Sequence, residues 1–180
     1  MKYNASELIK VMILDIKANK ANYRCLSMIL MYRVAHFFSK MRKTGLIGKI
    51  VSAPFLIIYR FITEWLFHYE LPAATEIGRG LIIDHGYGIV INKHTVIGDN
   101  VRIKHGVTIG CKTLSNGGQG PSPIIGSDVD IGAGAKIIGE VRVGRGVRIG
   151  AGAVVVKDVP DDCLAVGNPC RIIHLNVQNV

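Results

Sequence analysis

The chain has 180 residues, of which 49% are hydrophobic and 19% charged, and its formal net charge is +9. This length and composition suit a folded domain with a substantial core, and they exclude a disordered chain. Charge and glycine are both unevenly distributed. Residues 1–70 hold eleven Lys and Arg against four acids, whereas 19 of the 21 glycines follow Glu70. The sequence therefore divides into a basic, glycine-poor front part and a glycine-rich remainder.

The basic front part indicates attraction to an anionic partner, either lipid headgroups or a phosphorylated substrate. A solvated basic helix face would explain it equally well. No nucleic-acid motif and no basic–aromatic array occurs, so no nucleic-acid partner is expected. The four cysteines show neither a CxxC pair nor metal-ligand spacing, and the opening residues are too polar for a signal peptide. We therefore expect a cytoplasmic protein with reduced thiols.

Residues 1–70 are predicted to form a helical segment. Residues 26–38 are apolar on most faces, which predicts a packed helix that ends near Gly45. Residues 46–69 are the most hydrophobic stretch, but charged residues interrupt it and Pro54 divides it, so a membrane span is not expected. Two explanations stay open. The helices pack on protein within an oligomer, or residues 1–69 make peripheral membrane contact at the inner face of the cytoplasmic membrane, with Trp65 at headgroup level.

A six-residue repeat organises residues 71–160. The aliphatic residues that mark it are Ile77, Ile83, Ile91, Ile97, Ile103, Ile109, Ile125, Ile131, Ile137, Val143, Ile149 and Val155. This period predicts a β-solenoid of triangular coils, about eighteen residues each, with these side chains stacked inside. Flat coil walls can pack around a threefold axis, which predicts a homotrimer. The groove between two walls suits an extended, amide-rich ligand such as the pantetheine arm of coenzyme A.

The first interruption of the repeat, residues 84–90, is two residues longer than a six. It places His85 at a corner next to Asp84 and Gly86, where the imidazole projects out of the coil. An exposed histidine is often an ordinary surface residue. Imidazole titrates near neutral pH, however, so His85 is also a candidate general base that takes a hydroxyl proton and returns it to a leaving thiolate.

The second interruption, residues 111–124, adds ten residues to one six and is polar and rich in Gly and Pro. This composition predicts an excursion loop that overhangs the groove and helps to close an acceptor site, with a plain surface loop as the alternative. Beyond the repeat, residues 161–180 form a C-terminal tail. Lys157 and Arg171 lie near the end of the groove, where their charges suit the phosphates of coenzyme A.

These stretches resemble the hexapeptide-repeat acyltransferases, in particular the serine acetyltransferases. The sequences that carry the resemblance are IGRGLIIDHGYGIVI, GVTIG, IGAGAKIIGEVRVGRGVRIGAGAVVVKDVP and VGNPCRII. Together with the front segment and YELPAATEIG, they are more similar still to the colanic-acid-type acetyltransferases of exopolysaccharide gene clusters. The resemblance implies a left-handed parallel β-helix, acetyl-CoA as co-substrate, a homotrimer, and neither a metal nor a tightly bound cofactor.

The same resemblance implies roles for single residues. His85 matches the catalytic histidine, and Glu70, fifteen residues earlier, stands where serine acetyltransferases carry the aspartate of the catalytic dyad. Asp84 matches a substrate-binding aspartate. The acetyl-CoA-binding positions are Gly110, Cys111, Ala133, Ala151, Lys157 and Arg171, and Cys111 replaces a common glycine. Ser122 lies in the acceptor site, where serine acetyltransferases have Arg-His-Pro and this chain has Pro-Ser-Pro.

The loss of that arginine and histidine favours a different acceptor. The expected activity is acetyl-CoA-dependent O-acetylation of a sugar hydroxyl in an exopolysaccharide or capsule repeat unit, with the acceptor lipid-linked or free. The alternative is serine O-acetylation in cysteine biosynthesis. A γ-type carbonic anhydrase would need three histidines on zinc, but the spacings of His85, His94 and His105 do not match that pattern. A non-catalytic trimeric scaffold or membrane-docking module is a third class, but a scaffold would need neither the DHG corner nor the NPCRII tail.

Overall fold

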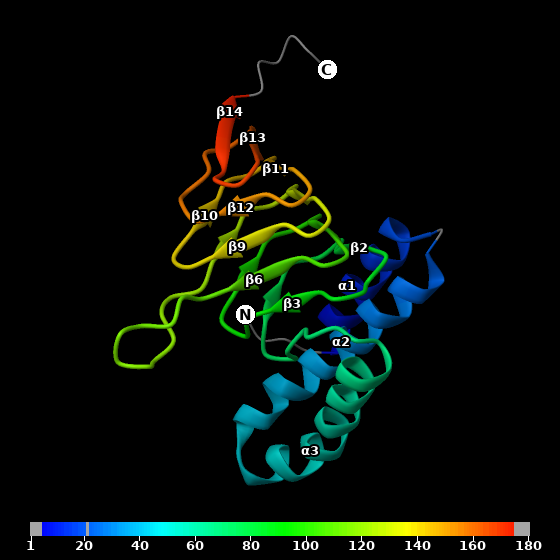
Figure 1. Ribbon diagram of the computed structural model, residues 1–180. Helices are drawn as coiled ribbons and strands as arrows, with labels where there is room; N and C mark the ends of the chain where they lie inside the picture. The colour runs from blue at the N-terminus through cyan, green and yellow to red at the C-terminus, as the bar shows by residue number, and fades with distance from the viewer. Residues whose placement is uncertain (1–4, 21, 175–180) are drawn as a thin grey trace.

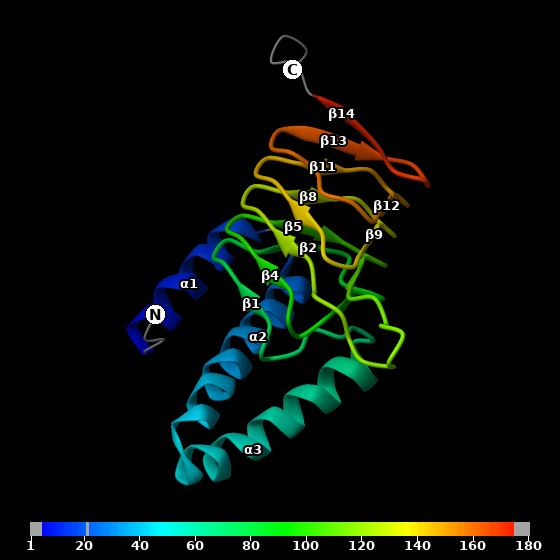
Figure 2. The ribbon, with the colours of Figure 1, turned by 90° about the vertical axis from the view of Figure 1, so that its left-hand side faces the viewer.

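Three helices lie at the base of a tapering stack of β-coils in the computed structural model (Figures 1 and 2). The structure describes residues 5–20 and 22–174. The helices are α1 (Ala5–Ala18), α2 (Tyr23–Met41) and α3 (Leu46–Phe61); a 3₁₀ turn, Arg42–Thr44, precedes α3, and a π-helical turn, Ile62–Leu66, continues it.

The coils form three sheets, and all twelve strands of the coils themselves pair in parallel. The β1 sheet contains β1 (Glu76–Ile77), β4 (Val96–Ile97), β7 (Ile124–Ile125) and β10 (Arg142–Val143). The β3 sheet contains β3 (Val90–Ile91), β6 (Thr108–Gly110), β9 (Lys136–Ile138) and β12 (Val154–Val155). The β2 sheet contains β2 (Ile82–Asp84), β5 (Arg102–Lys104), β8 (Asp130–Ile131), β11 (Arg148–Ile149), β13 (Cys163–Val166) and β14 (Arg171–His174). The predicted left-handed parallel β-helix with an N-terminal helical segment is confirmed.

The strand register accounts for both interruptions of the repeat. Asp130 pairs with Arg148, eighteen residues later, which is one regular coil. Ile82 pairs with Arg102 at a separation of twenty, and Arg102 pairs with Asp130 at a separation of twenty-eight. The extra two and ten residues therefore leave the coil at its corners and do not disturb the pairing of the strands.

The core is a double column of aliphatic side chains. Every predicted repeat residue from Ile83 to Val155 is buried, whereas Ile77 at the open base is only partly buried. The residue two positions earlier also points inward in each coil, since side chains alternate along a strand. Val101, Val107, Val129, Val141 and Val147 are buried in this second column.

Close stacking of the coils requires glycine at one corner. A Cβ on Gly126 would lie 2.8 Å from the carbonyl carbon of Gly144, and a Cβ on Gly98 would lie 2.7 Å from the carbonyl carbon of Gly126. Backbone atoms cannot move away at such distances without separating the coils. This explains why glycine follows the inward residue at these positions of the repeat.

Side chains of α1 and α2 close the base of the β-helix. Asp15 and Arg33 form an ion pair at 2.7 Å, and both side chains are at most 1% exposed. Arg33 also donates to the carbonyl oxygens of Ile77 and Gly78, while the Asp15 carboxylate accepts from the backbone N–H of Leu81. These bonds satisfy the polar backbone groups of the first coil, which has no coil beneath it.

Helix α3 returns beneath the coils (Figure 2) and is anchored by Tyr59, whose hydroxyl donates to the carbonyl of Leu71 at 2.7 Å. The helix runs unbroken through Pro54, so the predicted division at that residue is wrong. Gly48, Ser52, Tyr59 and Thr63 face inward and are buried, and most of the remaining residues are exposed. Leu46–Leu66 is long and apolar enough to cross a membrane by length and composition, and 22% of its 18-residue apolar window is buried.

The top of the stack ends in a hairpin. β13 pairs in parallel with β11, so coil structure continues past the expected tail boundary at Pro160, and Ala165 is buried. β14 then pairs antiparallel with β13. Residues 175–180 of the predicted tail lie outside the described residues.

Candidate active site

The predicted site residues gather on two corners of the β-helix. We call the corner between the β2 sheet and the β3 sheet the histidine edge. It stacks the turns after β2, β5, β8 and β11, which hold His85, His105, Ala133 and Ala151 respectively. We call the corner between the β3 sheet and the β1 sheet the excursion edge. It holds Asn92, Gly110, Cys111 and the loop 111–124 that projects from the coils (Figure 1).

Hydrogen bonds tie the turns of the histidine edge into one column. The carbonyl of Tyr87 accepts from Gly106 N–H, that of His105 from Gly134 N–H, and that of Ala133 from Gly152 N–H, at 2.8 to 2.9 Å. Each of the three donors is a glycine with φ between 67° and 70°. Residues with a Cβ rarely adopt this conformation, so glycine suits all three positions.

His85 projects from the lowest turn of this edge. Its φ is 62° and its side chain is exposed, as expected for a residue that leaves the coil. The ring lies edge-to-face on that of His105, with centroids 5.9 Å apart. Helix α2 packs directly behind the turn, because a Cβ on Gly86 would lie 2.6 Å from the methyl carbon of Met28. Met28 thus holds the corner from the side opposite to solvent.

Glu70 is fixed through its backbone beside the strand that follows His85. Its N–H donates to the carbonyl of Ile89 at 2.7 Å, and its carbonyl accepts from Ile91 N–H at 2.9 Å. The carboxylate is exposed, and among the described residues no side chain bonds it. The structure therefore brings Glu70 to the coil of His85 without joining the two side chains.

Asp84 forms an ion pair with Arg102, whose guanidinium donates to the Asp84 carboxylate at 2.9 Å. Tyr87, two residues after His85, is 49% exposed and carries the guanidinium of Arg24 over its ring at 3.9 Å. The surroundings of His85 thus contain two arginine contacts, one from the next coil and one from α2. Neither was expected from the sequence.

The excursion edge is organised by Asn92. Its Oδ1 accepts from the Ser122 hydroxyl at 3.0 Å and from His94 N–H at 2.9 Å, and its Nδ2 donates to the Cys111 sulfur at 3.4 Å. One side chain thereby holds both ends of the excursion. Between those ends the loop folds back on itself, with Gly120 N–H donating to the carbonyl of Lys112 at 2.8 Å.

The two predicted cations lie at the top of the stack. Arg171 begins β14, where it pairs with Val166, and Lys157 follows β12 on the excursion edge. Both lie near Cys170, whose thiol donates to the carbonyl of Arg171. Burial raises the pKa of this thiol, and the charge of Lys157 offsets part of the increase. The predicted phosphate-binding residues thus lie at the opposite end of the coils from His85.

A single chain does not bring all of these residues together. His85, Ala133 and Ala151 lie on the histidine edge, whereas Gly110, Cys111, Ser122 and Lys157 lie on the excursion edge or its continuation. The β3 sheet separates the two edges. The third histidine of the alternative zinc site, His94, also lies on the excursion edge, and within the described ranges no three His, Cys, Asp or Glu residues form a group that could hold a metal.

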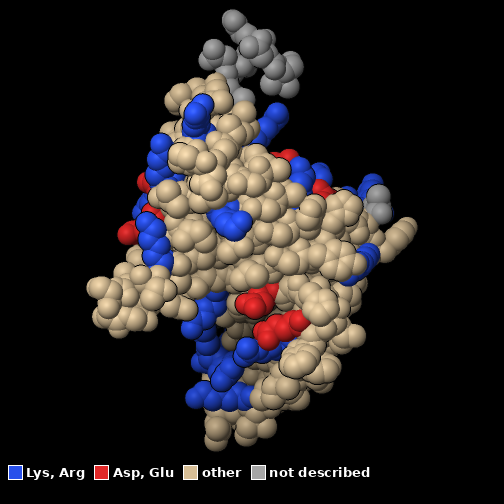
Figure 3. Space-filling model, viewed as in Figure 1, with Lys and Arg blue, Asp and Glu red and all other residues tan. Residues whose placement is uncertain are grey.

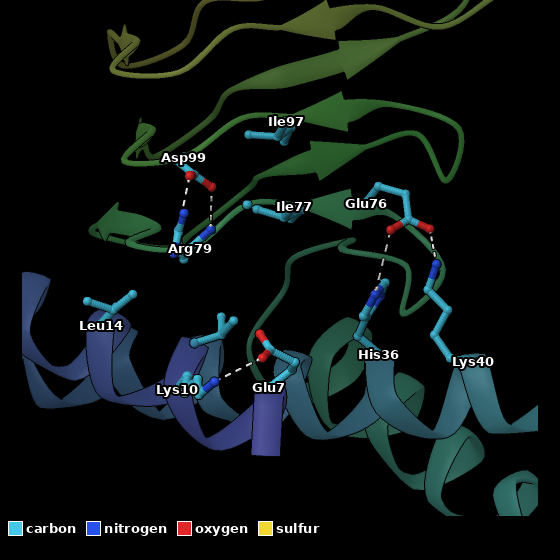
Figure 4. Close-up of a pocket in the computed structure, with 12 residues that line it drawn as sticks. Glu7, Lys10, Leu14, His36, Lys40, Glu76, Ile77, Arg79, Ile97 and Asp99 are labelled. Carbon is cyan, nitrogen blue, oxygen red and sulfur yellow. Dashed lines mark hydrogen bonds and ion pairs between the residues drawn. The ribbon is translucent and has the colours of Figure 1, made fainter. Parts of the chain in front are cut away.

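A cavity of about 630 Å³ lies away from both edges, between α1, α2 and the β1 sheet (Figure 4). Its charged side chains pair with one another: Lys40 with Glu76, Arg79 with Asp99, and Lys10 with Glu7. His36 lines it, and burial lowers the pKa of this imidazole. None of the predicted site residues borders this cavity.

Sequence reasoning missed three contributors to the two edges. His105 follows His85 by twenty residues, one coil plus the two inserted residues, so the repeat could have placed it above His85. The Arg24–Tyr87 contact joins helix to coil and leaves no local signal. The link from Asn92 to the excursion likewise has no sequence signal, because Cys111 and Ser122 follow it by 19 and 30 residues.

Comparison with known proteins identifies the family. Residues 122–157 match the bacterial transferase hexapeptide (six repeats) family. The protein of Escherichia coli K12 that is assigned to colanic acid biosynthesis as the acetyltransferase WcaB is 45% identical over 161 residues, which is 89% of this chain and 98% of the relative. The chain belongs to the hexapeptide-repeat acetyltransferases.

Serine acetyltransferases are further members of this family. That of Bacillus pumilus is 42% identical over 158 residues, 88% of this chain and 68% of that protein. The soybean apoenzyme aligns with a TM-score of 0.77 and 32% identity over 92% of this chain and 69% of that chain. A serine acetyltransferase in complex with CoA aligns with a TM-score of 0.73 and 27% identity over 94% of this chain and 71% of that chain. The expected family and enzyme class are confirmed: the protein is an acetyltransferase.

Proposed function

We propose that this acetyltransferase moves the acetyl group of acetyl-CoA to a sugar hydroxyl of an exopolysaccharide or capsule repeat unit. The observation that carries the proposal is the colanic acid relative, which matches this chain over 98% of its own length. The excursion supports it as well. Serine acetyltransferases place a basic Arg-His pair there, whereas this chain places Ser122, whose hydroxyl is bonded to Asn92.

In the proposed reaction His85 is the general base. Its unprotonated ring nitrogen takes the proton of the acceptor hydroxyl as the oxygen attacks the thioester carbonyl. The new C–O bond forms, the C–S bond breaks, and the imidazolium returns the proton to the CoA thiolate. Glu70 orients and stabilises the imidazolium once the substrate has closed the site. The products are the acetyl ester and CoA.

We propose that the groove is completed between neighbouring chains of a homotrimer. The excursion leaves the coils outward, so its corner cannot lie on a threefold axis. If the opposite corner, between the β1 and β2 sheets, faces the axis, the histidine edge of one chain meets the excursion edge of the next. Ala133 and Ala151 then border one side of the pantetheine arm, Gly110 and Cys111 border the other, and Lys157 and Arg171 lie toward the phosphates.

Serine O-acetylation is the second candidate, since the serine acetyltransferases match 88% of this chain at 42% identity. In that case Asp84 would bind the amino group of the substrate. Its pairing with Arg102 favours the sugar instead, because the carboxylate already has a cationic partner.

An acceptor screen tests the proposal. Purified protein is incubated with acetyl-CoA and either L-serine, nucleotide sugars or exopolysaccharide repeat units, and CoA release is measured with a thiol reagent. We expect release that depends on a saccharide acceptor and disappears in His85→Ala. Release that depends only on L-serine would replace the proposed acceptor, and undiminished release by His85→Ala would overturn the role of His85.

A further inference from the structure

The outward side of α3 is an apolar surface with no partner in the described chain. We call this surface the α3 face; it consists of Leu46, Ile47, Ile50, Ile57, Phe61 and Trp65, which are 57% to 79% exposed. The spacing of Leu46, Ile50, Ile57 and Phe61 is that of one side of a helix. Soluble monomers rarely expose so large a contiguous apolar patch, which marks an interaction surface.

Cations accompany the α3 face at the start of the helix. Arg42, Lys43 and Lys49 are all exposed, and no acid lies between residues 41 and 63. Figure 3 shows Lys and Arg gathered on the lower part of the molecule, around the α2–α3 end, next to uncharged surface. The one acid of the segment, Glu64, is paired with Arg60 at 2.8 Å.

A groove between α2 and α3 opens beside this surface. Its volume is about 320 Å³, and it is lined by side chains such as Met31, Phe38, Phe55 and Ile58. The only polar side chain in its wall, Tyr59, turns its hydroxyl to the Leu71 carbonyl instead. An acyl chain would meet almost only apolar atoms there.

We propose that α3 lies in the plane of an anionic membrane, with the α3 face in the acyl region and the basic residues Arg42, Lys43 and Lys49 at the lipid phosphates. A second copy of the chain fits less well, because the α3 face offers no free acid to meet these three cations. A transmembrane position is excluded by the anchoring of Tyr59 and the burial of Gly48, Ser52 and Thr63 against the protein.

The position of α3 makes the contact multivalent. It crosses the base of the coils, at the end opposite to β14 (Figure 2). In a trimer whose axis runs along the coils, three α3 faces point the same way, so a planar membrane binds all three at once. The π-helical turn after α3 ends four residues before Glu70. The proposed active site is therefore close to the lipid, which, given the proposed function, suits a lipid-linked saccharide acceptor.

Vesicle sedimentation of the full chain tests the binding. We expect the protein to pellet with phosphatidylcholine vesicles that contain roughly 30 mol % phosphatidylglycerol, and to be released by high salt. Ile50→Glu/Ile57→Glu should lower the partition coefficient by roughly tenfold or more. The charge-matched control Tyr23→Glu/Ile173→Glu changes two exposed apolar residues elsewhere and should bind like the natural protein. Equal loss in both variants, or no sedimentation of the natural protein, would overturn the proposal.

Trp65 gives an independent readout, because it is the single tryptophan of the chain. On anionic vesicles its emission should shift to the blue and be quenched by brominated acyl chains; unchanged emission would contradict insertion.

Sedimentation velocity tests the alternative occupant of the α3 face, a second copy of the chain. If Ile50→Glu/Ile57→Glu breaks a larger assembly into smaller ones and the natural protein ignores vesicles, the α3 face is an interface between copies. Since neither readout uses acetyl transfer, failure of the membrane proposal and failure of the proposed function are distinguishable.

Discussion

His85 leaves the coil from a strained backbone conformation. At a φ of 62°, a residue with a Cβ loses about 1 kcal/mol or more relative to glycine. No hydrogen bond of its ring recovers this cost within the described chain, which is typical of a residue kept for activity and not for stability.

Replacing His85 by glycine should therefore separate activity from stability. We expect His85→Gly to lose at least about two orders of magnitude in kcat, because the proposed general base is absent. The unfolding free energy should rise by about 1 kcal/mol, because the strain is relieved. Asp162→Gly is the matched control, since Asp162 has a φ of 52° on another corner: it should gain stability and keep its activity. Activity assays and urea unfolding measure both effects.

The buried Asp15–Arg33 pair should be the most costly ion pair to break. Asp15→Ala leaves a buried guanidinium without its counter-ion and removes the acceptor of Leu81 N–H. We expect a loss of about 3–5 kcal/mol in urea unfolding. The exposed pair Arg60–Glu64 supplies the control, because Glu64→Ala should change stability by less than about 1 kcal/mol. Similar losses in both variants would contradict a structural role for the buried pair.

His36 should make stability depend on pH. Burial lowers the pKa of this imidazole in the folded protein, and its Nδ1–H donates to the carbonyl of Ala73 at 2.9 Å. The unfolded chain then binds the proton more readily, so stability should be complete above about pH 6.5 and fall below it. His36→Asn keeps a donor at the position of Nδ1 and should flatten this dependence. Urea midpoints on either side of pH 6.5 measure it; an unchanged slope would exclude His36 as the cause.

At the scale of the element, the excursion depends on one asparagine. Ser122→Ala removes one of the bonds of Asn92 and should raise the KM of the acceptor by about two- to tenfold, equivalent to one ordinary hydrogen bond. The KM of acetyl-CoA and the melting temperature should hardly change, because the coils do not depend on the loop. Initial-rate kinetics with each substrate varied in turn check this. Ser115→Ala in the tip of the same loop is the control, and an equal effect there would remove the special role of Ser122.

The coils were predictable from sequence because each one repeats the same local rule. An aliphatic residue every sixth position, followed in many coils by glycine, packs only against the neighbouring coils, so the local sequence is enough to predict it. The strand register confirms the insertions of two and ten residues as well. Contacts between helix and coil follow no such period. Three such contacts join residues more than forty positions apart: those of Arg33 with Ile77, of Asp15 in α1 with Leu81, and of Arg24 with Tyr87. The prediction at Pro54 was wrong for a related reason: the packing of α3 on α2 outweighs the free-energy cost of a proline inside the helix.

At the scale of the whole molecule, the proposed site belongs to two chains. Co-expression of His85→Ala with Asn92→Ala/Ser122→Ala should therefore yield active mixed trimers. In every mixed trimer, one of the three sites would combine an intact histidine edge with an intact excursion edge. Tandem affinity tags isolate the mixed trimers, and their rate should exceed the mean of the two homotrimers. Mixed trimers at that mean would indicate that each chain contains a complete site.

The fixed number of coils sets the distance between the two ends of the β-helix. From β2 to β14 there are five strand spacings of about 4.8 Å, which set the turn of His85 about 24 Å from the strand of Arg171. Side chains close the stack at the base and a reversed strand closes it at the top, so the chain can neither gain nor lose a coil without a change of sequence. An insertion or deletion of eighteen residues would preserve every pairing rule and still misalign the two ends. Under the proposed function, loop sequences set the acceptor site, whereas the number of coils sets the distance between His85 and the residues proposed to bind the CoA phosphates.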